Sequence, residues 1–131
     1  MNKTNAMRQL ETAKINFRTA EYEVDENDLS GVHVAKELGQ PPEQVFKTLV
    51  LKGERTGFFV CCIPVDKELD LKKAAKAPIG MKKKFPTFID ETAILFDEIA
   101  VSAGIRGAQI IVNGETLAEY LGAELIDLVQ D

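Results

Sequence analysis

The chain has 131 residues, of which 45% are hydrophobic and 28% are charged, and its formal net charge is −5. This length fits one domain with a single apolar core, and the composition excludes a disordered chain. The acidic balance argues against a protein that coats nucleic acid through bulk electrostatics. No apolar run approaches the roughly 20 residues that cross a bilayer, and the polar start is not expected to be a secretory signal.

The first half of the chain predicts two helices, a strand and a hairpin. Thr4 is positioned to cap a helix, and Phe17–Glu23 then has a strand pattern. Val32–Leu38 predicts a short helix that ends at Gly39, the residue type that most easily takes a left-handed backbone. Two further runs predict a β-hairpin across a glycine-containing turn: Phe46–Lys52 and Phe58–Ile63.

The second half alternates short strands with helical segments. Asp70 is expected to cap a helix that reaches about Ala77, Asp90 and Glu91 are expected to begin a helical turn, and Asn113 is expected to cap a helix ending at Gly122. Further strands are expected at Thr87–Ile89, Ile99–Ser102, Gln109–Val112 and Leu125–Val129. This order favours a mixed α/β (α+β) fold, with a mixed sheet or open barrel and helices around it, in one domain of residues 1–131.

Lys47 lies inside the apolar run Val45–Lys52, where a charged side chain needs an explanation. Spacing alone leaves two interpretations open. The lysine points to solvent from a half-exposed strand, or it holds its ammonium group at the floor of a cleft for an anionic or polarised ligand.

Lysines are concentrated between residues 67 and 84, in a stretch with few acids. They are Lys67, Lys72, Lys73, Lys76, Lys82, Lys83 and Lys84. The stretch is either a solvated face or a small phosphate-contacting patch, in which Lys82–Lys84 would touch the end of an RNA.

Familiar catalytic patterns, such as the P-loop, the Rossmann glycines and the nucleophile elbow, are absent from the sequence. Cys61 and Cys62 are adjacent, would face opposite sides of a strand, and are expected to be core thiols in a reducing cytoplasm. His33 is the single histidine, cannot build a metal site alone, and is expected at the surface or a rim. An enzyme made from this chain would need no metal or cofactor and would rely on positioning, a lysine charge, backbone donors or a substrate group.

Five short motifs occur in a fixed order along the chain. They are Val45-Phe46-Lys47-Thr48-Leu49, Leu69-Asp70-Leu71-Lys72-Lys73-Ala74, Pro78-Ile79-Gly80, Pro86-Thr87-Phe88-Ile89-Asp90 and Val101-Ser102-Ala103-Gly104-Ile105-Arg106-Gly107. Together they resemble the YbaK/EbsC family, the free-standing relatives of the editing domain inserted in bacterial prolyl-tRNA synthetase. The resemblance implies a deacylase of mischarged tRNA, most typically Cys-tRNA(Pro), and a six- or seven-stranded mixed sheet, partly rolled into a barrel, with helices around it.

The resemblance also implies roles for particular residues. Lys47 matches the essential lysine, Thr48 lines the pocket beside it, Tyr22 matches an aromatic residue at the cleft, and Ser102 matches a pocket hydroxyl. Further substrate-binding positions are Ser30, Pro78, Gly80 and Gln109. In the mechanism that the resemblance implies, the substrate cysteine's own thiol attacks its ester carbonyl and releases a cyclic thiolactone, so the protein supplies no nucleophile.

The chain departs from the family pattern in two ways. Gln109 stands where relatives carry aspartate, and Ser30 stands where many carry an aromatic residue, so the preference for cysteine is open. A further segment normally follows Ala77, but here Pro78 comes next. Either the protein has lost the segment, or the printed sequence omits a loop between residues 77 and 78. We expect the omission, because a deletion would remove a pocket wall while leaving both flanking motifs intact.

Three functions therefore stay open. The first is a trans-acting aminoacyl-tRNA deacylase, which the resemblance favours. The second is a non-catalytic module that binds aminoacyl-tRNA or a synthetase, and the third is an enzyme for another small ester or amide. The expected partners are the 3′ end of aminoacyl-tRNA and prolyl-tRNA synthetase, with a small homo-oligomer implied by the resemblance and no membrane contact.

Overall fold

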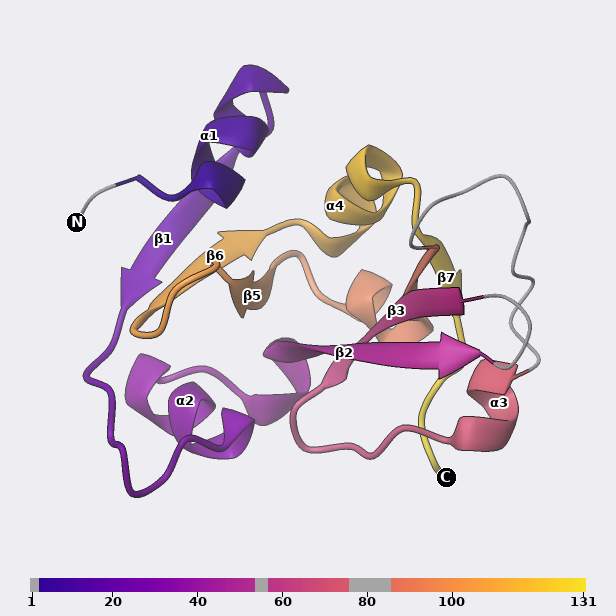
Figure 1. Cartoon of the computed structure of the whole chain (residues 1–131). Coiled ribbons are helices and arrows are strands. Elements are labelled where there is room, and N and C mark those ends of the chain that lie inside the picture. The colour runs from indigo at the N-terminus through magenta and orange to yellow at the C-terminus, as the bar shows by residue number, and fades with distance from the viewer. Residues whose placement is uncertain (1–2, 54–56, 76–85) are drawn as a thin grey trace.

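The strands of the protein form two sheets, in a computed structural model that describes residues 3–53, 57–75 and 86–131 (Figure 1). One sheet is antiparallel, has the order β1-β6-β5, and consists of β1 (Phe17–Glu21), β6 (Ala108–Val112) and β5 (Ile99–Ser102). The other is mixed, has the order β2-β3-β4-β7, and consists of β2 (Phe46–Gly53), β3 (Gly57–Pro64), β4 (Thr87–Asp90) and β7 (Glu124–Ile126).

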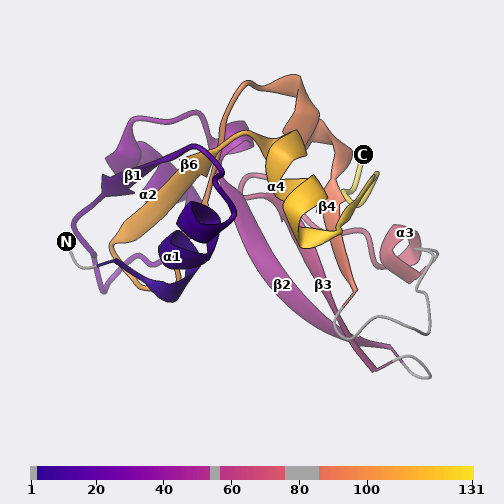
Figure 2. The ribbon, with the colours of Figure 1, turned by 90° about the horizontal axis from the view of Figure 1, so that it is seen from above.

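The pairings within the second sheet explain why it is mixed. The strands β2 and β3 form the expected antiparallel hairpin, whereas β3–β4 and β4–β7 are parallel pairs. Among the described residues, one isolated parallel bridge, between Val45 and Ala100, connects the two sheets. Figure 2 shows β1 and β6 of the first sheet apart from β2, β3 and β4 of the second. The mixed α/β class is therefore confirmed, but the described strands form two sheets of three and four strands instead of one, and neither sheet closes into a barrel.

The helices begin and end at residues whose chemistry fits those positions. The Thr4 hydroxyl accepts a hydrogen bond from the Met7 amide at the start of α1 (Asn5–Thr12), and Asn113 caps α4 (Gly114–Leu121) through the Thr116 amide. Gly122, with φ of 65°, ends α4 in the left-handed conformation that glycine tolerates. The remaining helical segments are α2 (Gly31–Leu38), α3 (Leu71–Ala75) and two short 3₁₀ turns, Pro42–Gln44 and Glu91–Leu95.

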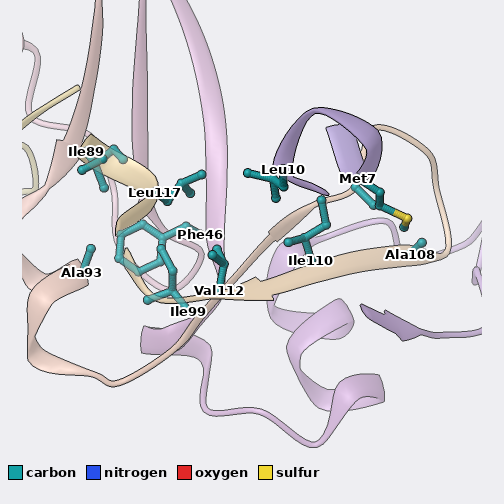
Figure 3. Packing of buried hydrophobic residues seen from close by; sticks show 12 residues of the cluster. Met7, Leu10, Phe46, Ile89, Ala93, Ile99, Ala108, Ile110, Val112 and Leu117 are labelled. Atoms are coloured by element: carbon teal, nitrogen blue, oxygen red, sulfur yellow. The ribbon is translucent and has the colours of Figure 1, made fainter. Parts of the chain in front are cut away.

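Buried side chains from both sheets form the largest hydrophobic cluster. Met7 and Leu10 of α1 lie over Ile110 of β6, while Phe46 of β2 meets Ile99 of β5 near the junction of the sheets (Figure 3). A second cluster lies beneath α3 between β3, β4 and the C-terminal segment, and a third lies between α2 and the opposite face of the β1-β6-β5 sheet. Helices α1 and α2 therefore cover opposite faces of the three-stranded sheet, and this fixes which of its side chains face α2.

The last strand is shorter than the sequence predicted. It ends at Ile126 rather than Val129, because the Leu128 amide donates a 2.9 Å hydrogen bond to the buried carboxylate of Asp90 instead of continuing the ladder. Val129 then forms only an isolated bridge to Leu69. None of the helices in the described part of the chain has the length and apolar character needed to span a membrane.

Candidate active site

Lys47 is the second residue of β2, an edge strand of the four-stranded sheet, and its side chain is partly exposed. Strand alternation puts it on the same face as Val45 and Leu49, and its cross-strand neighbour is Ile63. No carboxylate of the described chain forms an ion pair with its ammonium group. The lysine therefore lies on a strand without a counter-charge among the described residues, and an anionic or polarised ligand can interact with it.

The junction of the two sheets aligns Lys47 with polar residues of the other sheet. The parallel bridge pairs Val45 with Ala100, so Lys47 and Ser102 each lie two residues beyond the junction of the sheets. Ser102 is in register with Gln109 on β6, and Gln109 is in register with Ala20 on β1. We call Lys47, Ser102 and Gln109 the polar row.

Two further predicted residues lie near the ends of this row. The Tyr22 amide donates a 2.9 Å hydrogen bond to the Gly107 carbonyl, which extends the β1–β6 pairing by one position and keeps Tyr22 close to Gln109 along the sheet. The Ser30 hydroxyl caps α2 by accepting a hydrogen bond from the His33 amide. This cap fixes Ser30 at the start of α2.

A close contact fixes the beginning of α2 against the start of β2. A Cβ atom placed on Gly31 would lie 2.4 Å from Cγ1 of Val65, so the helix backbone approaches that valine as only glycine allows. The Val65 amide in turn donates a 2.8 Å hydrogen bond to the Val45 carbonyl. These contacts connect Ser30 to the strand that carries Lys47.

Thr48 does not share the face of Lys47. As the next residue on an extended strand, it points to the opposite side of the sheet, where its hydroxyl lies 3.7 Å from the thiol of Cys62. Its side chain and that of Lys47 are therefore not brought together. Pro78, Gly80 and Lys82–Lys84, together with the Ala77–Pro78 junction, lie outside the described residues.

The two cysteines are poor nucleophiles in this fold. Cys61 is fully buried, and that burial, with a smaller effect of the neighbouring Cys62, raises the pKa of its thiol to about 11. Burial also raises the pKa of the Cys62 thiol, against a smaller lowering by the hydrogen bond with Thr48. Since the thiolate is the reactive species, both side chains stay largely protonated and unreactive near neutral pH.

Ser102 and Gln109 have hydrogen-bonding capacity that the described chain does not use. The Ser102 hydroxyl accepts a hydrogen bond from the Gly104 amide at 3.1 Å, which leaves its own proton available for donation. The amide oxygen of Gln109 is buried and has no hydrogen-bond partner among the described residues. The row therefore offers a cation, a hydroxyl donor and a buried acceptor in that order.

The surroundings of His33 were not anticipated from the sequence. Its ring is four-fifths buried and lies 3.9 Å from Asp25, 3.7 Å from Asp28 and 3.5 Å from Glu37. The i,i+4 spacing to Glu37 was readable from the sequence, but the return of residues 25–28 onto the helix was not. The described residues hold no group of three or more side chains suited to a metal ion.

Comparisons with known proteins identify relatives of this chain. A family model described as "Aminoacyl-tRNA editing domain" matches residues 29–78, which contain Lys47. The "Putative Cys-tRNA(Pro)/Cys-tRNA(Cys) deacylase EbsC" of Enterococcus faecalis is 38% identical over 152 residues, covering 96% of this chain and 93% of that protein. Since 96% of 131 residues is about 126, about 26 of those 152 positions have no residue in this chain.

Solved structures share the fold at lower sequence identity. A crystal structure described as "a putative trans-editing enzyme for prolyl tRNA synthetase" has a TM-score of 0.77 and 20% identity, and covers 99% of this chain and 100% of its own. The hypothetical protein APE2540 has a TM-score of 0.80 and 15% identity, with coverages of 94% and 97%. With 38% identity to the EbsC protein across almost its whole length, the chain belongs to the aminoacyl-tRNA editing family of YbaK and EbsC.

Proposed function

We propose that this protein is a trans-acting deacylase that hydrolyses the ester bond of mischarged tRNA, with Cys-tRNA(Pro) as its main substrate. The polar row supports the proposal, because Lys47 and Ser102 each lie two residues from the bridge that joins the sheets. The relationship to the EbsC protein supports the same class of substrate. The protonated state of Cys61 supports a mechanism without a protein thiolate.

The row suggests how the protein would act on an aminoacyl ester. The Lys47 ammonium group would stabilise negative charge that develops on the reacting atoms or hold a phosphate of the RNA end. The Ser102 hydroxyl would donate a hydrogen bond to the ester carbonyl. Tyr22 would contact the terminal nucleoside. Ser30, together with Pro78 and Gly80 from outside the described residues, would contact the substrate at the rim of the site. Thr48 would act through its main chain or from the opposite face.

The bond changes are supplied by the substrate in this mechanism. The cysteine sulfur attacks its own ester carbonyl, a carbon–sulfur bond forms, and the bond from that carbon to the ribose oxygen breaks. The thiol proton passes to the ribose oxygen, which leaves free tRNA and a cyclic cysteine thiolactone. Water then opens the thiolactone to cysteine. Positioning the thiol against the carbonyl is the protein's main contribution.

The partners follow from this chemistry. We infer that the protein meets aminoacyl-tRNA in the cytoplasm and takes its tRNA specificity from a complex with prolyl-tRNA synthetase, as a small homo-oligomer. Lys82–Lys84 would contact phosphates, so tRNA affinity should fall steeply with salt, and alanine at all three positions should reduce that dependence. We also infer that the relatives' extra positions include a loop at the Ala77–Pro78 junction.

The decisive assay is deacylation of Cys-tRNA(Pro) by wild type and by Lys47→Ala. We expect the substitution to lower the rate at least about a hundredfold, the usual effect of removing a group that stabilises developing charge. Lys52→Ala is the matched control, since Lys52 lies on the same strand but faces the other side, 5.8 Å from the Phe58 ring. Equal rates for Lys47→Ala and wild type would reject the role of Lys47.

Replacing the thiol by a hydroxyl tests the substrate's part in the reaction. Seryl- and alanyl-tRNA(Pro) should be hydrolysed far more slowly than Cys-tRNA(Pro) if the thiol is the nucleophile. Similar rates for all three esters would reject substrate assistance. Binding of tRNA without any shortening of the ester lifetime would identify a non-catalytic binding module.

A further inference from the structure

Gln109 has a buried amide oxygen that nothing in the described chain satisfies. The residue is 7% exposed, and its Oε1 has no hydrogen-bond partner. Buried polar atoms in native proteins are nearly always paired, because an unpaired one loses its hydrogen bonds to water without replacement. An unsatisfied acceptor at a candidate site is therefore explained most simply by a donor that arrives with the ligand.

The neighbours of Gln109 limit what that ligand can be. On its own face of the sheet it lies between Ala20 and Ser102, with Gly107 and Ile111 two residues away along β6. None of these four side chains carries a charge, and the one polar group, the Ser102 hydroxyl, accepts from the Gly104 amide and makes no hydrogen bond with Gln109 Oε1. The Oε1 atom thus requires a ligand group with an N–H or O–H proton, and the terminal amide can turn towards such a group because its last torsion is soft.

The order of groups in the polar row matches the order of groups in an aminoacyl ester. Lys47 and Ser102 attract acceptors, such as the ester carbonyl oxygen, whereas Gln109 attracts a donor. In an aminoacyl ester the amino group lies on the carbon next to the carbonyl, about 3 Å from the carbonyl oxygen. Adjacent strands lie roughly 4.8 Å apart, so Ser102 and Gln109 can each bond one of the two groups.

From this match we propose that the Gln109 side chain binds the α-amino group of the aminoacyl moiety and so distinguishes aminoacyl esters from esters without that group. The inference rests on the proposed function, since it takes aminoacyl-tRNA as the ligand. An uncharged amide oxygen accepts a hydrogen bond from both the neutral amine and the ammonium form. Binding should therefore depend little on pH across the titration of the substrate amine.

Non-hydrolysable adenosine analogues separate this inference from catalysis. The probes are 3′-cysteinylamido-3′-deoxyadenosine, its counterpart with 3-mercaptopropionyl in place of cysteinyl, and the 2′-deoxy form of the first. Their dissociation constants are measured by calorimetry for wild type and for Gln109→Leu. We expect wild type to bind the cysteinyl probe about tenfold more tightly than the mercaptopropionyl probe, and Gln109→Leu to bind both equally.

Two results would overturn the inference. One is equal discrimination between these probes by wild type and Gln109→Leu. The other is a wild-type affinity that falls when the 2′-hydroxyl group is removed but not when the amino group is removed, since Gln109 would then bind the ribose. Absence of tRNA deacylation with the expected binding pattern would reject the proposed reaction but leave the role of Gln109 intact. If wild type deacylates Cys-tRNA(Pro) but Gln109→Leu still distinguishes the two probes as wild type does, the role of Gln109 is rejected and the proposed reaction is not.

A second variant covers the case in which Gln109→Leu does not fold. Gln109→Glu has nearly the same shape and carries a charge, so it should prefer the ammonium form and lose affinity for the cysteinyl probe as pH rises through the amine titration. The mercaptopropionyl probe should show no such pH dependence. A pH-independent preference between the probes in Gln109→Glu would contradict contact between this side chain and the amino group.

Discussion

Replacing Gly31 by alanine should strain the contact that positions the beginning of α2. The added Cβ would lie 2.4 Å from Cγ1 and 2.6 Å from Cβ of Val65, whereas carbon atoms pack at about 3.5–4.0 Å. The Val65 Cβ atom is attached directly to the backbone, so it cannot turn away. The helix or the segment after β3 must therefore move, and Ser30 at the helix start would move with it.

The expected cost follows from two opposing effects. Overpacking of this kind costs about 1–3 kcal/mol, while alanine in place of glycine in a helix recovers at most about 1 kcal/mol. Gly31→Ala should therefore lower the free energy of unfolding by about 1–2 kcal/mol, as measured by urea unfolding. The variant should also deacylate Cys-tRNA(Pro) more slowly, because Val65 bonds the Val45 carbonyl, two residues before Lys47.

A double-mutant cycle with Val65→Ala tests the stated cause. That change removes the closer contact, Cγ1, and keeps the Cβ contact, so the cost of Gly31→Ala should shrink by at least about 0.5 kcal/mol without vanishing. Val32→Ala, next in the helix and about half exposed, controls for general effects at the helix start. A Gly31→Ala protein as stable as wild type, or a cost unchanged by Val65→Ala, would refute this reasoning.

Three further predictions concern other parts of the fold. Asp90→Ala should lower the free energy of unfolding by about 3 kcal/mol in urea, because it leaves the Leu128 amide buried without its acceptor; a loss under about 1 kcal/mol would contradict this role. Cys61, with a pKa of about 11, should react with iodoacetamide at pH 8 at least about a hundredfold more slowly than a free cysteine, as followed by mass spectrometry, and rapid labelling of the native protein would show the burial to be wrong. The hydrogen bond from Lys73 lowers the pKa of Asp127, so this pair contributes stability above the ordinary aspartate pKa and loses it as pH falls through the lowered value. The difference in unfolding free energy between wild type and Lys73→Met should thus shrink in acid, to the part that comes from the Lys73 hydrogen bond to the Val129 carbonyl; a difference that does not change with pH would refute the contribution of the ion pair.

Local signals account for most of the elements that the sequence predicted correctly. Thr4 and Asn113 supply cap oxygens, and Gly39 and Gly122 supply left-handed backbone at the helix ends, so these boundaries depend only on nearby residues. The β2–β3 hairpin is likewise set by its turn and apolar runs. The role of Asp90 at the following helical turn is confirmed by its hydrogen bond to the Thr92 amide.

The features that the sequence did not reveal depend on contacts between distant segments. The two sheets are joined by the isolated Val45–Ala100 bridge, and neither segment carries a local signal for that pairing. The early end of β7 depends on the buried Asp90 carboxylate, which only the folded chain brings to Leu128.

Within the candidate site, the register of Ser102 with Gln109 could be inferred from their hairpin, whereas the alignment with Lys47 could not. Resemblance alone grouped Thr48 with Lys47, although strand alternation separates their side chains.

The single bridge between the sheets has a consequence for how this junction can be probed. The Val45 carbonyl accepts a hydrogen bond from the Val65 amide, so the peptide groups of Val45 point towards β3. Peptide groups alternate in direction along a strand, so those of Thr48 point the other way, towards β5. The hydrogen-bonded ladder between β2 and β5 does not continue there. Peptide groups there must bond to solvent or to a bound molecule. Side-chain replacement leaves a peptide N–H in place, so alanine scanning would not detect a ligand bound by these peptide groups. Backbone amide-to-ester exchange at Thr48 would reveal it.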